Sequence, residues 1–313
     1  MNGLRVVQPG MLSLLQDEGR FGQHRIGLTN GGPVDPTAMY WANRLLDNPH
    51  GATALEVSFG GLELEAGVDT WISVTGGDAR LSINDVEVET WHSQRVTEGD
   101  RISLGFAQAF CRSYLAVNGG FRVQPRFGST STVARECIGG LNGGKLEPGD
   151  LLQCKPADKG RYLRVPVMDR PHYQSNIQVR VIPGYQDHQF SRLQQRRFFS
   201  GSYTVTDRAD RMGYRLQGPE IKCEVEGILS EGICHGAIQI PADGQPIVLL
   251  NDRQTIGGYP KIGSALSLDT AKLAQLMPGS TVRFEPVSAY AAHNALHMAA
   301  SRFQRSAAEV CGP

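Results

Sequence analysis

The sequence predicts a mainly β protein of two domains with a few short helices. Short stretches of alternating apolar and polar residues recur along the chain, bounded by Gly, Pro, Asn or Asp, as is typical of antiparallel sheets. The chain contains 37 glycines and 17 prolines, which suits many tight turns and bends. Its 313 residues are too many for one small core, and length alone favours two domains.

Eight stretches have the alternation expected of strands. They cover residues 70–78, 79–85, 100–106, 112–120, 178–184, 202–207, 245–252 and 280–286. Three short segments, "EGD" (98–100), "EPGD" (147–150) and "MPGS" (277–280), each lead into an apolar strand. We interpret them as one kind of turn used three times, although the segments are too short to establish an internal repeat.

Helical periodicity is clearest at residues 35–46. Asp35 can cap the helix, Pro36 suits its first turn, and Asn48-Pro49 ends it. Its apolar residues fall on one face, so this helix is predicted to pack on a sheet. Weaker helical patterns cover residues 187–199, 269–277 and 289–308. The apolar face consists of Ala38, Trp41, Ala42, Leu45 and Leu46.

A candidate linker divides the chain into nearly equal halves. Residues 155–176 are basic, interrupted by prolines and weakly periodic. We therefore expect one domain over residues 1–165 and a second over residues 175–313, with segments that can interleave across the boundary.

Composition limits the classes of partner. Lys+Arg and Asp+Glu both total 31, so no overall field attracts the protein to nucleic acid or to an anionic membrane. A bound anion must be met by a local cluster. The six cysteines are scattered without a C-x-x-C pair, and the first ten residues have neither a basic start nor an apolar core. We expect reduced thiols, a cytoplasmic location and no spanning helix.

Two motifs are set aside. "GGLNGGK" (139–145) has the spacing of a phosphate-binding loop, but Leu146 replaces the hydroxyl residue and "LEPGD" predicts a turn where a helix is required. His293 and His297 are four residues apart, as metal ligands can be, but no third ligand is near in the sequence. We assign no metal ligand, and no serine or cysteine lies in a recognisable nucleophile motif.

Five stretches place Asp, Arg, Gln or Glu beside glycine at the ends of predicted strands. Glycine lets a ligand approach bare amides, and arginine offers a rigid fork for carboxylate or phosphate. The alternative for any one stretch is ordinary turn chemistry with solvated charges. For the last stretch a second alternative is a strand connection whose Arg and Gln satisfy buried carbonyls. The stretches are residues 14–22, 28–36, 207–219, 230–246 and 251–263.

The same stretches carry a resemblance that runs from about residue 4 to about residue 287. The chain resembles the family of the C-type subunit of bacterial ATP-dependent 5-oxoprolinase. That family also holds the KipA-type antagonists of a kinase inhibitor, and the carboxyltransferase piece of urea carboxylase (its C-D part), also called allophanate hydrolase subunit 2. The stretches are "VVQPGMLSLLQDEGRFG", "GGPVDPTAMYWANRLLDNP", "ALEVSFGG", "SYLAVNGGF", "GSTST", "DRMGYRLQGP" and "GAIQIPADGQPIVLLNDRQTIGGYPKIG".

The resemblance implies a fold, partners and co-substrates. The fold is a pair of cyclophilin-like β-barrel domains. The partners are a KipI-like, B-type subunit of 5-oxoprolinase and its third, A-type subunit. ATP, with Mg²⁺, would activate the unstrained lactam by phosphorylating its oxygen. The chain has no lysine tether for biotin, so biotin would act only through another protein.

The resemblance also implies site residues. Asp252, Arg253, Gln254 and Lys261 are carried over as catalytic. Asp35 has a competing role as a helix cap, and Asp17 a competing role in bracing its turn. Cys234, His235 and Ile256 depart from the family pattern, which leaves substrate preference open. The residues carried over for binding substrate or nucleotide are Asp17, Arg20, Gly31, Gly32, Asp35, Arg211, Gln239, Gly257, Gly258 and Tyr259.

Three functions follow from the resemblance. The first is a subunit of a 5-oxoprolinase that opens 5-oxoproline to L-glutamate with the A-type and B-type subunits. The second is a carboxyltransferase subunit for urea or a related amide. The third is a non-catalytic KipA-like regulator that binds a KipI-like inhibitor.

Overall fold

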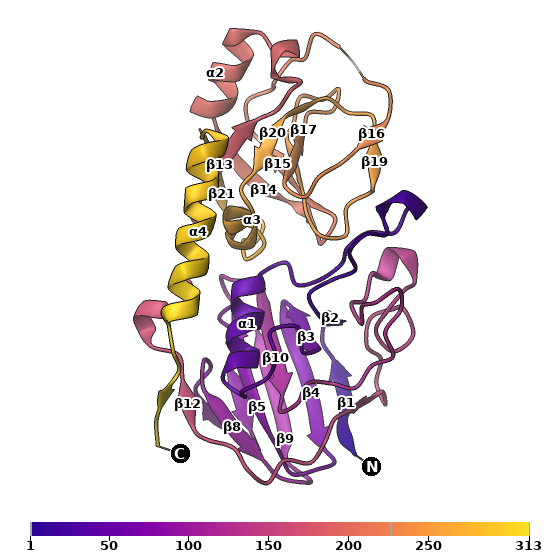
Figure 1. Ribbon diagram of the computed structural model, residues 1–313, viewed down its shortest axis with the longest axis vertical. Helices are drawn as coiled ribbons and strands as arrows, with labels where there is room; N and C mark the ends of the chain where they lie inside the picture. Colours follow the sequence, from indigo (N-terminus) through magenta and orange to yellow (C-terminus); the bar gives the residue numbers. More distant parts are fainter. Residues whose placement is uncertain (1, 226, 313) are drawn as a thin grey trace. The chain divides into compact units, whose positions relative to one another are not determined.

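The computed structural model describes residues 2–225 and 227–312 and divides the chain into two compact units (Figure 1). Unit 1 comprises Met1–Phe21, Gly31–His172 and Ser306–Pro313. Unit 2 comprises Gly22–Asn30 and Tyr173–Arg305. The main crossing between the units falls between His172 and Tyr173, and residues 22–30 and 306–313 each belong to the other unit than their place in the sequence suggests.

Unit 1 is built on two open antiparallel sheets. The six-stranded sheet has the order β11-β1-β4-β9-β6-β7 and the five-stranded sheet the order β2-β3-β10-β5-β8. The first contains β1 (Gly3–Pro9), β4 (Gly60–Ala66), β6 (Leu81–Ile83), β7 (Val86–Val88), β9 (Arg101–Phe106) and β11 (Leu151–Gln153). The second contains β2 (Leu12–Gln16), β3 (Ala54–Ser58), β5 (Thr70–Gly76), β8 (Ser93–Val96) and β10 (Arg112–Val117).

The core of unit 1 is contributed by both sheets, because alternate side chains of each strand point to the same face. Leu62 and Leu64 of β4 join Leu55 and Val57 of β3 in one buried cluster. Strands β3, β5 and β10 are buried along their whole length. Their second face is therefore also covered.

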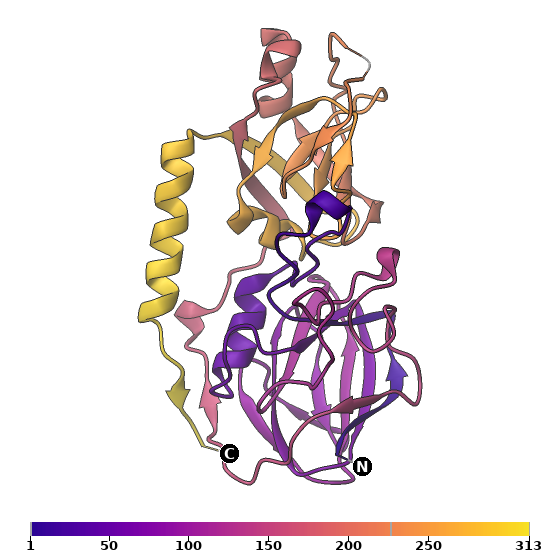
Figure 2. The same cartoon turned by 45° about the vertical axis from the view of Figure 1, so that its right-hand side comes forward.

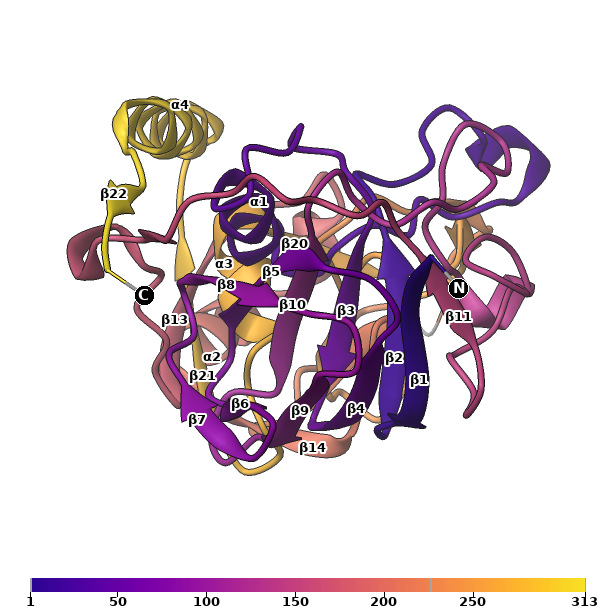
Figure 3. The same cartoon turned by 90° about the horizontal axis from the view of Figure 1, so that it is seen from below.

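The cover is α1 (Pro36–Arg44), which contacts β5 and β10 (Figure 3). Its predicted apolar face is buried. Two hydroxyl groups on the outer face of β5 bond to helix carbonyls: Ser73 Oγ donates to Ala42 O at 2.7 Å and Thr75 Oγ1 to Ala38 O at 2.7 Å. The predicted helix is confirmed, and these hydroxyls explain polar positions in a fully buried strand.

Unit 2 contains a closed barrel of strands in the order β13-β20-β17-β18-β15-β14-β21. All neighbours are antiparallel except β13 and β21, which run parallel with Asn176 opposite Thr281. A mainly β fold is thus confirmed, with one closed barrel and, in unit 1, two open sheets. The barrel strands are β13 (Asn176–Pro183), β14 (Ser202–Ala209), β15 (Gly213–Gln217), β17 (Ala237–Gln239), β18 (Ile247–Leu249), β20 (Lys261–Ala265) and β21 (Thr281–Pro286).

The remaining elements are short, apart from one helix. Strand β12 (Leu163–Arg164) pairs with β22 (Glu309–Val310), and β16 (Glu231–Gly232) pairs with β19 (Ile256–Gly257). Helix α4 (Ala289–Arg305), yellow in Figure 2, is largely exposed along its length. No helix within residues 2–225 and 227–312 is long and apolar enough to cross a membrane. The other helices are α2 (Arg192–Ser200), α3 (Ser267–Leu273) and α4 (Ala289–Arg305), with 3₁₀ turns η1 (His24–Ile26), η2 (Ala134–Glu136), η3 (Val167–Asp169) and η4 (Asp187–Gln189).

All eight predicted strand stretches contain a strand, and the three predicted turns share one hydrogen-bond pattern. In each, the glycine has a φ near +90° and its amide donates to a neighbouring strand: Gly99 to Ala66 O, Gly149 to Val6 O and Gly279 to Val205 O. The residue after each glycine accepts in return from the amide of that same strand residue. The interpretation of one turn used three times is therefore confirmed.

Substitution of Gly149 by alanine is expected to lower the free energy of unfolding of unit 1 by about 1 kcal/mol. Its φ of +91° disfavours any side chain, although a Cβ there would meet nothing within 4 Å. Gly144 is the matched control, since a Cβ there also meets nothing and its φ is not left-handed. Guanidinium denaturation of both variants measures the change in unfolding free energy. An equal loss in the two would contradict the conformational explanation.

Candidate functional site

The predicted polar loop at residues 251–263 borders a cleft of about 610 Å³ in unit 2. One side of the cleft is formed by residues of the segment 207–215, and β17 and β18 contribute Gln239, Ile247 and Leu249. Four of the predicted site residues therefore lie around one space. These are Gln239, Arg253, Gln254 and Tyr259.

Arg253 is the most informative of the four. Its side chain is buried, with the residue only 5% exposed, yet it lines the cleft. Nε donates to Ile233 O at 3.1 Å and Nη1 to Leu250 O at 3.3 Å, so two carbonyls hold the guanidinium. The alternative role of this arginine, bonding to buried carbonyls, is thus observed. Among the described residues, none brings a carboxylate within ion-pair distance of it. Burial lowers its pKa, but an arginine remains a cation at neutral pH.

A buried cation without a counter-ion is costly, and an anionic ligand would offset that cost. His235, which lies near Arg253, adds no second positive charge. Burial, and then the charge of Arg253, lower the pKa of His235 to about 4, although a hydrogen bond with Asn251 opposes the shift. His235 is therefore neutral at neutral pH. The cleft is thus suited to a ligand that carries a carboxylate or phosphate group next to Arg253.

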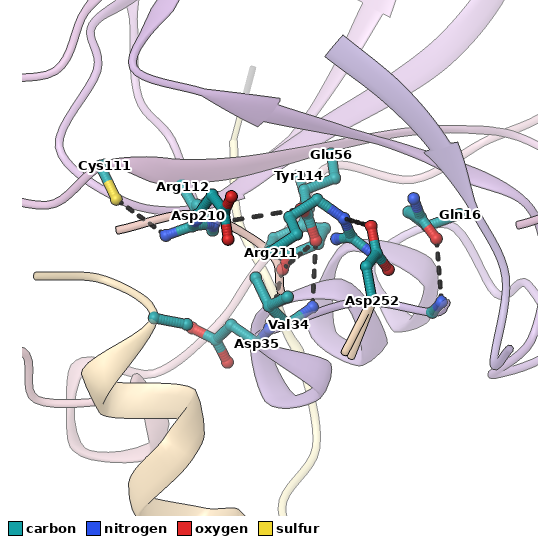
Figure 4. Close-up of polar contacts among 12 residues, drawn as sticks. Gln16, Val34, Asp35, Glu56, Cys111, Arg112, Tyr114, Asp210, Arg211 and Asp252 are labelled. Atoms are coloured by element: carbon teal, nitrogen blue, oxygen red, sulfur yellow. Dashed lines mark hydrogen bonds and ion pairs between the residues drawn. The ribbon is translucent and has the colours of Figure 1, made fainter. Parts of the chain in front are cut away.

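Arg211 and Asp252 form a buried ion pair beside the cleft (Figure 4). Arg211 Nε donates to Asp252 Oδ2 and Nη2 to Asp252 Oδ1, both at 2.9 Å, which is the two-bond geometry of an arginine with a carboxylate. Backbone bonds reinforce the link, because the Asp252 amide donates to Arg211 O at 2.9 Å. The pair ties the loop after β18 to the loop before β15.

Lys261 lies on β20, and neither it nor its partner Glu231 lines the cleft. Its ammonium group forms an ion pair with Glu231. The Lys261 amide donates to Gln186 Oε1 at 2.8 Å, and Gln186 Nε2 donates to Glu231 Oε1 at 3.0 Å. Lys261, Glu231 and Gln186 thus bond to one another in a polar group outside the lining of the cleft.

Gly257 and Gly258 follow the cleft residues, with β19 ending at Gly257. Neither has a left-handed φ, so conformational freedom does not explain them. Lack of space explains Gly257, because a Cβ there would lie 2.5 Å from Ile233 Cδ1 and 3.0 Å from Gln239 Nε2. At Gly258 a Cβ would lie 3.0 Å from Ile228 O. The two glycines let the loop pack closely on its neighbours.

The predicted residues of the first two polar stretches lie in unit 1, in tightly bonded surroundings. Asp17 accepts hydrogen bonds from Ser129 Oγ at 2.5 Å, Ser131 Oγ at 2.6 Å, the Thr130 amide at 2.7 Å and the Gly19 amide at 2.9 Å. These bonds fit the bracing role, because they tie residue 17 to the "GSTST" segment.

Arg20 is also buried and joins distant parts of the chain. Its Nε donates to Arg126 O at 3.0 Å and its Nη2 to Ser131 O at 2.9 Å. Gly139 leaves room for it, since a Cβ at position 139 would lie 3.1 Å from Arg20 Nη2. A role of Asp17 and Arg20 in binding a ligand stays a prediction.

Substitution of Asp17 by asparagine is expected to cost about 2 kcal/mol of unfolding free energy at pH 7. Burial alone would raise the pKa of Asp17, but its hydrogen bonds from Ser129, Ser131, Thr130 and Gly19 outweigh burial and lower the pKa below 3.8. A lowered pKa stabilises the folded state above the unfolded value, and this contribution disappears as pH falls through the folded pKa. The difference between wild type and variant should therefore shrink below about pH 4 in denaturation measurements. A difference that is constant from pH 7 to pH 3 would contradict it.

Gly31, Gly32 and Asp35 shape the start of α1. Both glycines have a left-handed φ, of +61° and +84°, and a Cβ on Gly32 would lie 2.9 Å from Glu18 O. Asp35 caps the helix by accepting from the Ala38 amide at 3.2 Å. The competing role of Asp35 is thus observed directly, while ligand binding by these three residues remains a prediction.

Sequence reasoning missed a buried polar group beneath α1. Tyr114 Oη donates to Glu56 Oε2 at 2.8 Å and accepts from the Asp35 amide at 2.8 Å (Figure 4). Burial raises the pKa of Tyr114 well above its usual value, and the charges of Glu56 and Asp35 add to the effect. Arg112 Nε lies 4.0 Å from Glu56 Oε1. The available signal was a charged residue in each of two buried strands, Glu56 in β3 and Arg112 at the start of β10.

Unit 1 has a larger hollow, of about 1020 Å³, between β6-β7 and residues 164–170. None of the predicted site residues lines it, and its charges pair with one another at the surface, as Arg80 does with Glu87 and Arg164 with Glu309. Within the described part of the chain, no three His, Cys, Asp or Glu side chains form a group that could hold a metal. The cleft of unit 2 is therefore the better candidate despite its smaller volume.

Comparisons with known proteins identify the family of the chain. The family model described as "Carboxyltransferase domain, subdomain A and B" matches residues 26–286, and the chain belongs to this family. The description names subdomains A and B, whereas the resemblance suggested the C-D part.

Relatives of the chain include a subunit of one enzyme and parts of longer enzymes. It is 36% identical to the C subunit of 5-oxoprolinase from Escherichia coli over 282 residues, which is 90% of each chain. It is 30% identical to urea amidolyase of Lachancea kluyveri over 90% of this chain but only 17% of that protein. The crystal structure of the K. lactis urea amidolyase superimposes with a TM-score of 0.90 and 27% identity, covering 96% of this chain and 20% of the other. The chain is thus homologous to one subunit of an enzyme, and it resembles one part of much longer enzymes.

Proposed function

We propose that this chain is the C-type subunit of an ATP-dependent 5-oxoprolinase, which opens 5-oxoproline to L-glutamate together with the A-type and B-type subunits. The level of identity carries the proposal, because the chain is 36% identical to its 5-oxoprolinase relative over 90% of each chain, and 30% or less to the urea amidolyases. The chain covers only 17% to 20% of the urea amidolyases. In this proposal its partners are the KipI-like, B-type subunit of the enzyme and the A-type one.

The cleft in unit 2 supports an anionic substrate. 5-Oxoproline carries one carboxylate and a neutral lactam, and in this proposal the carboxylate pairs with Arg253. The amide groups of Gln239 and Gln254 are suited to the lactam N–H and carbonyl, since an amide side chain both donates and accepts. Urea is neutral and would leave the buried charge of Arg253 without compensation.

The work proposed for this chain does not involve the nucleotide. The described residues form no group that could hold a metal, and no helix follows the glycine-rich segment 139–145. ATP, with Mg²⁺, would supply activation of the lactam oxygen as a co-substrate of the assembly. No residue of this chain is given a role in holding it, and the work proposed for the cleft is to bind and orient the lactam.

The same proposal extends to the fold. Both units are taken as cyclophilin-like barrels, one closed and one opened into two sheets. The shared turn supports a common origin, since Gly99 and Gly149 of unit 1 and Gly279 of unit 2 use the same hydrogen-bond pattern.

The experiment is ADP release by the chain, alone and mixed with the A-type and B-type subunits, with and without 5-oxoproline, while glutamate is assayed in parallel. Glutamate formed only by the mixture, in step with ADP, is the expected result. An assembled mixture that releases no 5-oxoproline-dependent ADP would reject the proposal. Tight binding of the KipI-like partner without any ATP consumption would instead support the KipA-like regulator.

A carboxyltransferase for urea or a related amide is the second candidate, and the TM-score of 0.90 to a urea amidolyase favours it. It requires a biotin carrier on another protein. Carboxylation of urea by this chain with a carboxylated biotin carrier, in the absence of 5-oxoproline turnover, would establish it.

A further inference from the structure

The carbonyl that accepts from Arg253 Nε belongs to a small flap whose two strands are separate from the closed barrel. We define the flap as residues 228–233 and 255–258. Its two strands, β16 and β19, pair antiparallel with Glu231 opposite Gly257. Backbone bonds extend the pairing at both ends: the Ile233 amide donates to Thr255 O at 3.0 Å and the Ile228 amide to Gly258 O at 2.9 Å. The two segments of the flap therefore move as one body.

The flap contacts the cleft through Ile233. This residue lines the cleft, and its carbonyl accepts the 3.1 Å hydrogen bond from Arg253 Nε. The second hold on the guanidinium, at Leu250 O, is longer, at 3.3 Å. A shift of the flap would thus move the carbonyl that sets the direction of the guanidinium.

Glu231 attaches the flap to the barrel. Its carboxylate pairs with the ammonium group of Lys261 on β20 and accepts from Gln186 Nε2 at 3.0 Å. Gln186 is itself fixed, because its Oε1 accepts from the Lys261 amide at 2.8 Å. The hydrogen bond from Lys261, followed by one from Tyr185, lowers the pKa of Glu231, so the carboxylate is ionised at neutral pH.

None of these three attachment residues lines the cleft, so they cannot act by touching a ligand there. The side chain of Lys261 is 9% exposed and that of Glu231 is 29% exposed. An ion pair that is partly shielded from water holds its geometry better than an exposed pair. The attachment therefore fixes the flap without adding any of its three side chains to the lining of the cleft.

We propose that Glu231 is a positioning residue for the anion site: by fixing the flap to Lys261 and Gln186, it holds the Ile233 carbonyl where it directs Arg253 into the cleft. Lys261, carried over as catalytic, then acts from behind the cleft through Glu231. The identity of the ligand rests on the proposed function, whereas the attachment itself does not.

The test is steady-state kinetics of the assembled three-subunit complex with Glu231→Ala. We expect KM for 5-oxoproline to rise on the order of tenfold with kcat changed less than twofold. The reason is that a misplaced Arg253 guanidinium weakens substrate binding more than it slows the chemical step. Glu231→Gln should recover part of the loss, since its amide oxygen still accepts from Lys261. Glu224→Ala is the matched control, as Glu224 lies on a neighbouring loop that does not line the cleft and should leave KM unchanged.

A double variant separates positioning from general loosening. In an Arg253→Lys background the Nε anchor is absent, so Glu231→Ala should add no further rise in KM. Equal effects of Glu231→Ala in both backgrounds, or an unchanged KM in the wild-type background, would overturn the inference while leaving the proposed function intact.

A measurement on the isolated chain distinguishes the two failures. Hydrogen exchange of the Ile228 and Ile233 amides, which depends on the flap and not on the substrate, should become faster in Glu231→Ala. If the wild-type complex never consumes 5-oxoproline, the proposed function fails. Amide exchange alone then tests the attachment by Glu231, and unchanged exchange in the variant would overturn it.

Discussion

Replacement of Arg253 by alanine is expected to lower kcat/KM for 5-oxoproline by about 100-fold in the assembled complex. The guanidinium is buried, lines the cleft and is held by two carbonyls, so its charge is available to a ligand carboxylate. The loss should appear mainly in KM, because the carboxylate is bound in the ground state as well as during the reaction.

Two further variants define the role of Arg253. Arg253→Lys keeps a charge but not the fork, and should recover only a small part of the loss. Arg208→Ala removes an exposed arginine that also lines the cleft and should change kcat/KM by less than about threefold. Unchanged turnover in Arg253→Ala, in a complex that still assembles, would remove Arg253 and its cleft from the proposed mechanism.

The second large effect concerns stability. Asp252→Ala is expected to lower the free energy of unfolding of unit 2 by about 3 kcal/mol, because it deprives a buried guanidinium of its carboxylate. Both Arg211–Asp252 hydrogen bonds are 2.9 Å long and the side chains are 4% and 8% exposed, so water cannot easily replace the lost partner. Chemical denaturation followed by circular dichroism measures the change.

A double variant tests the electrostatic cause. Arg211→Met combined with Asp252→Leu removes both charges and should be clearly more stable than Asp252→Ala alone. Asp207→Ala, at an exposed carboxylate on the preceding strand β14, is the control and should change stability by less than about 0.5 kcal/mol. If the single and double variants unfold at the same denaturant concentration, packing rather than charge explains the pair.

Local chemistry made much of the fold predictable. Helix α1 follows from Asp35, Pro36 and one apolar face, and the three turns follow from a glycine placed between an acidic or proline residue and a strand. These features depend on neighbours within a few residues, which a sequence displays directly. The open form of unit 1 depends on pairing between distant strands, so the pattern of alternation predicted strands but not how its sheets close.

The candidate site could likewise be predicted from the sequence only in part. The loop 251–263 was identifiable because polar residues and glycines follow an apolar strand, and the structure brings Gln239 to the same cleft. The partners of these residues were not identifiable. Glu231 reaches Lys261 across 30 residues of sequence, and Asp17 reaches Ser131 across 114. Such contacts depend on the finished fold, and no local pattern distinguishes Glu231 from other loop carboxylates.

The parallel pairing of β13 with β21 has a consequence for how the chain is made. The barrel needs β21 between β13 and β14, although β21 is the last of the three to leave the ribosome. Until then the two earlier strands present bare edges, which invite pairing with other chains. Strand pairing in unit 1 is also completed late, because β22, near the C-terminus, pairs with β12. A chain cut short after residue 280 would therefore leave both units incomplete and prone to aggregate.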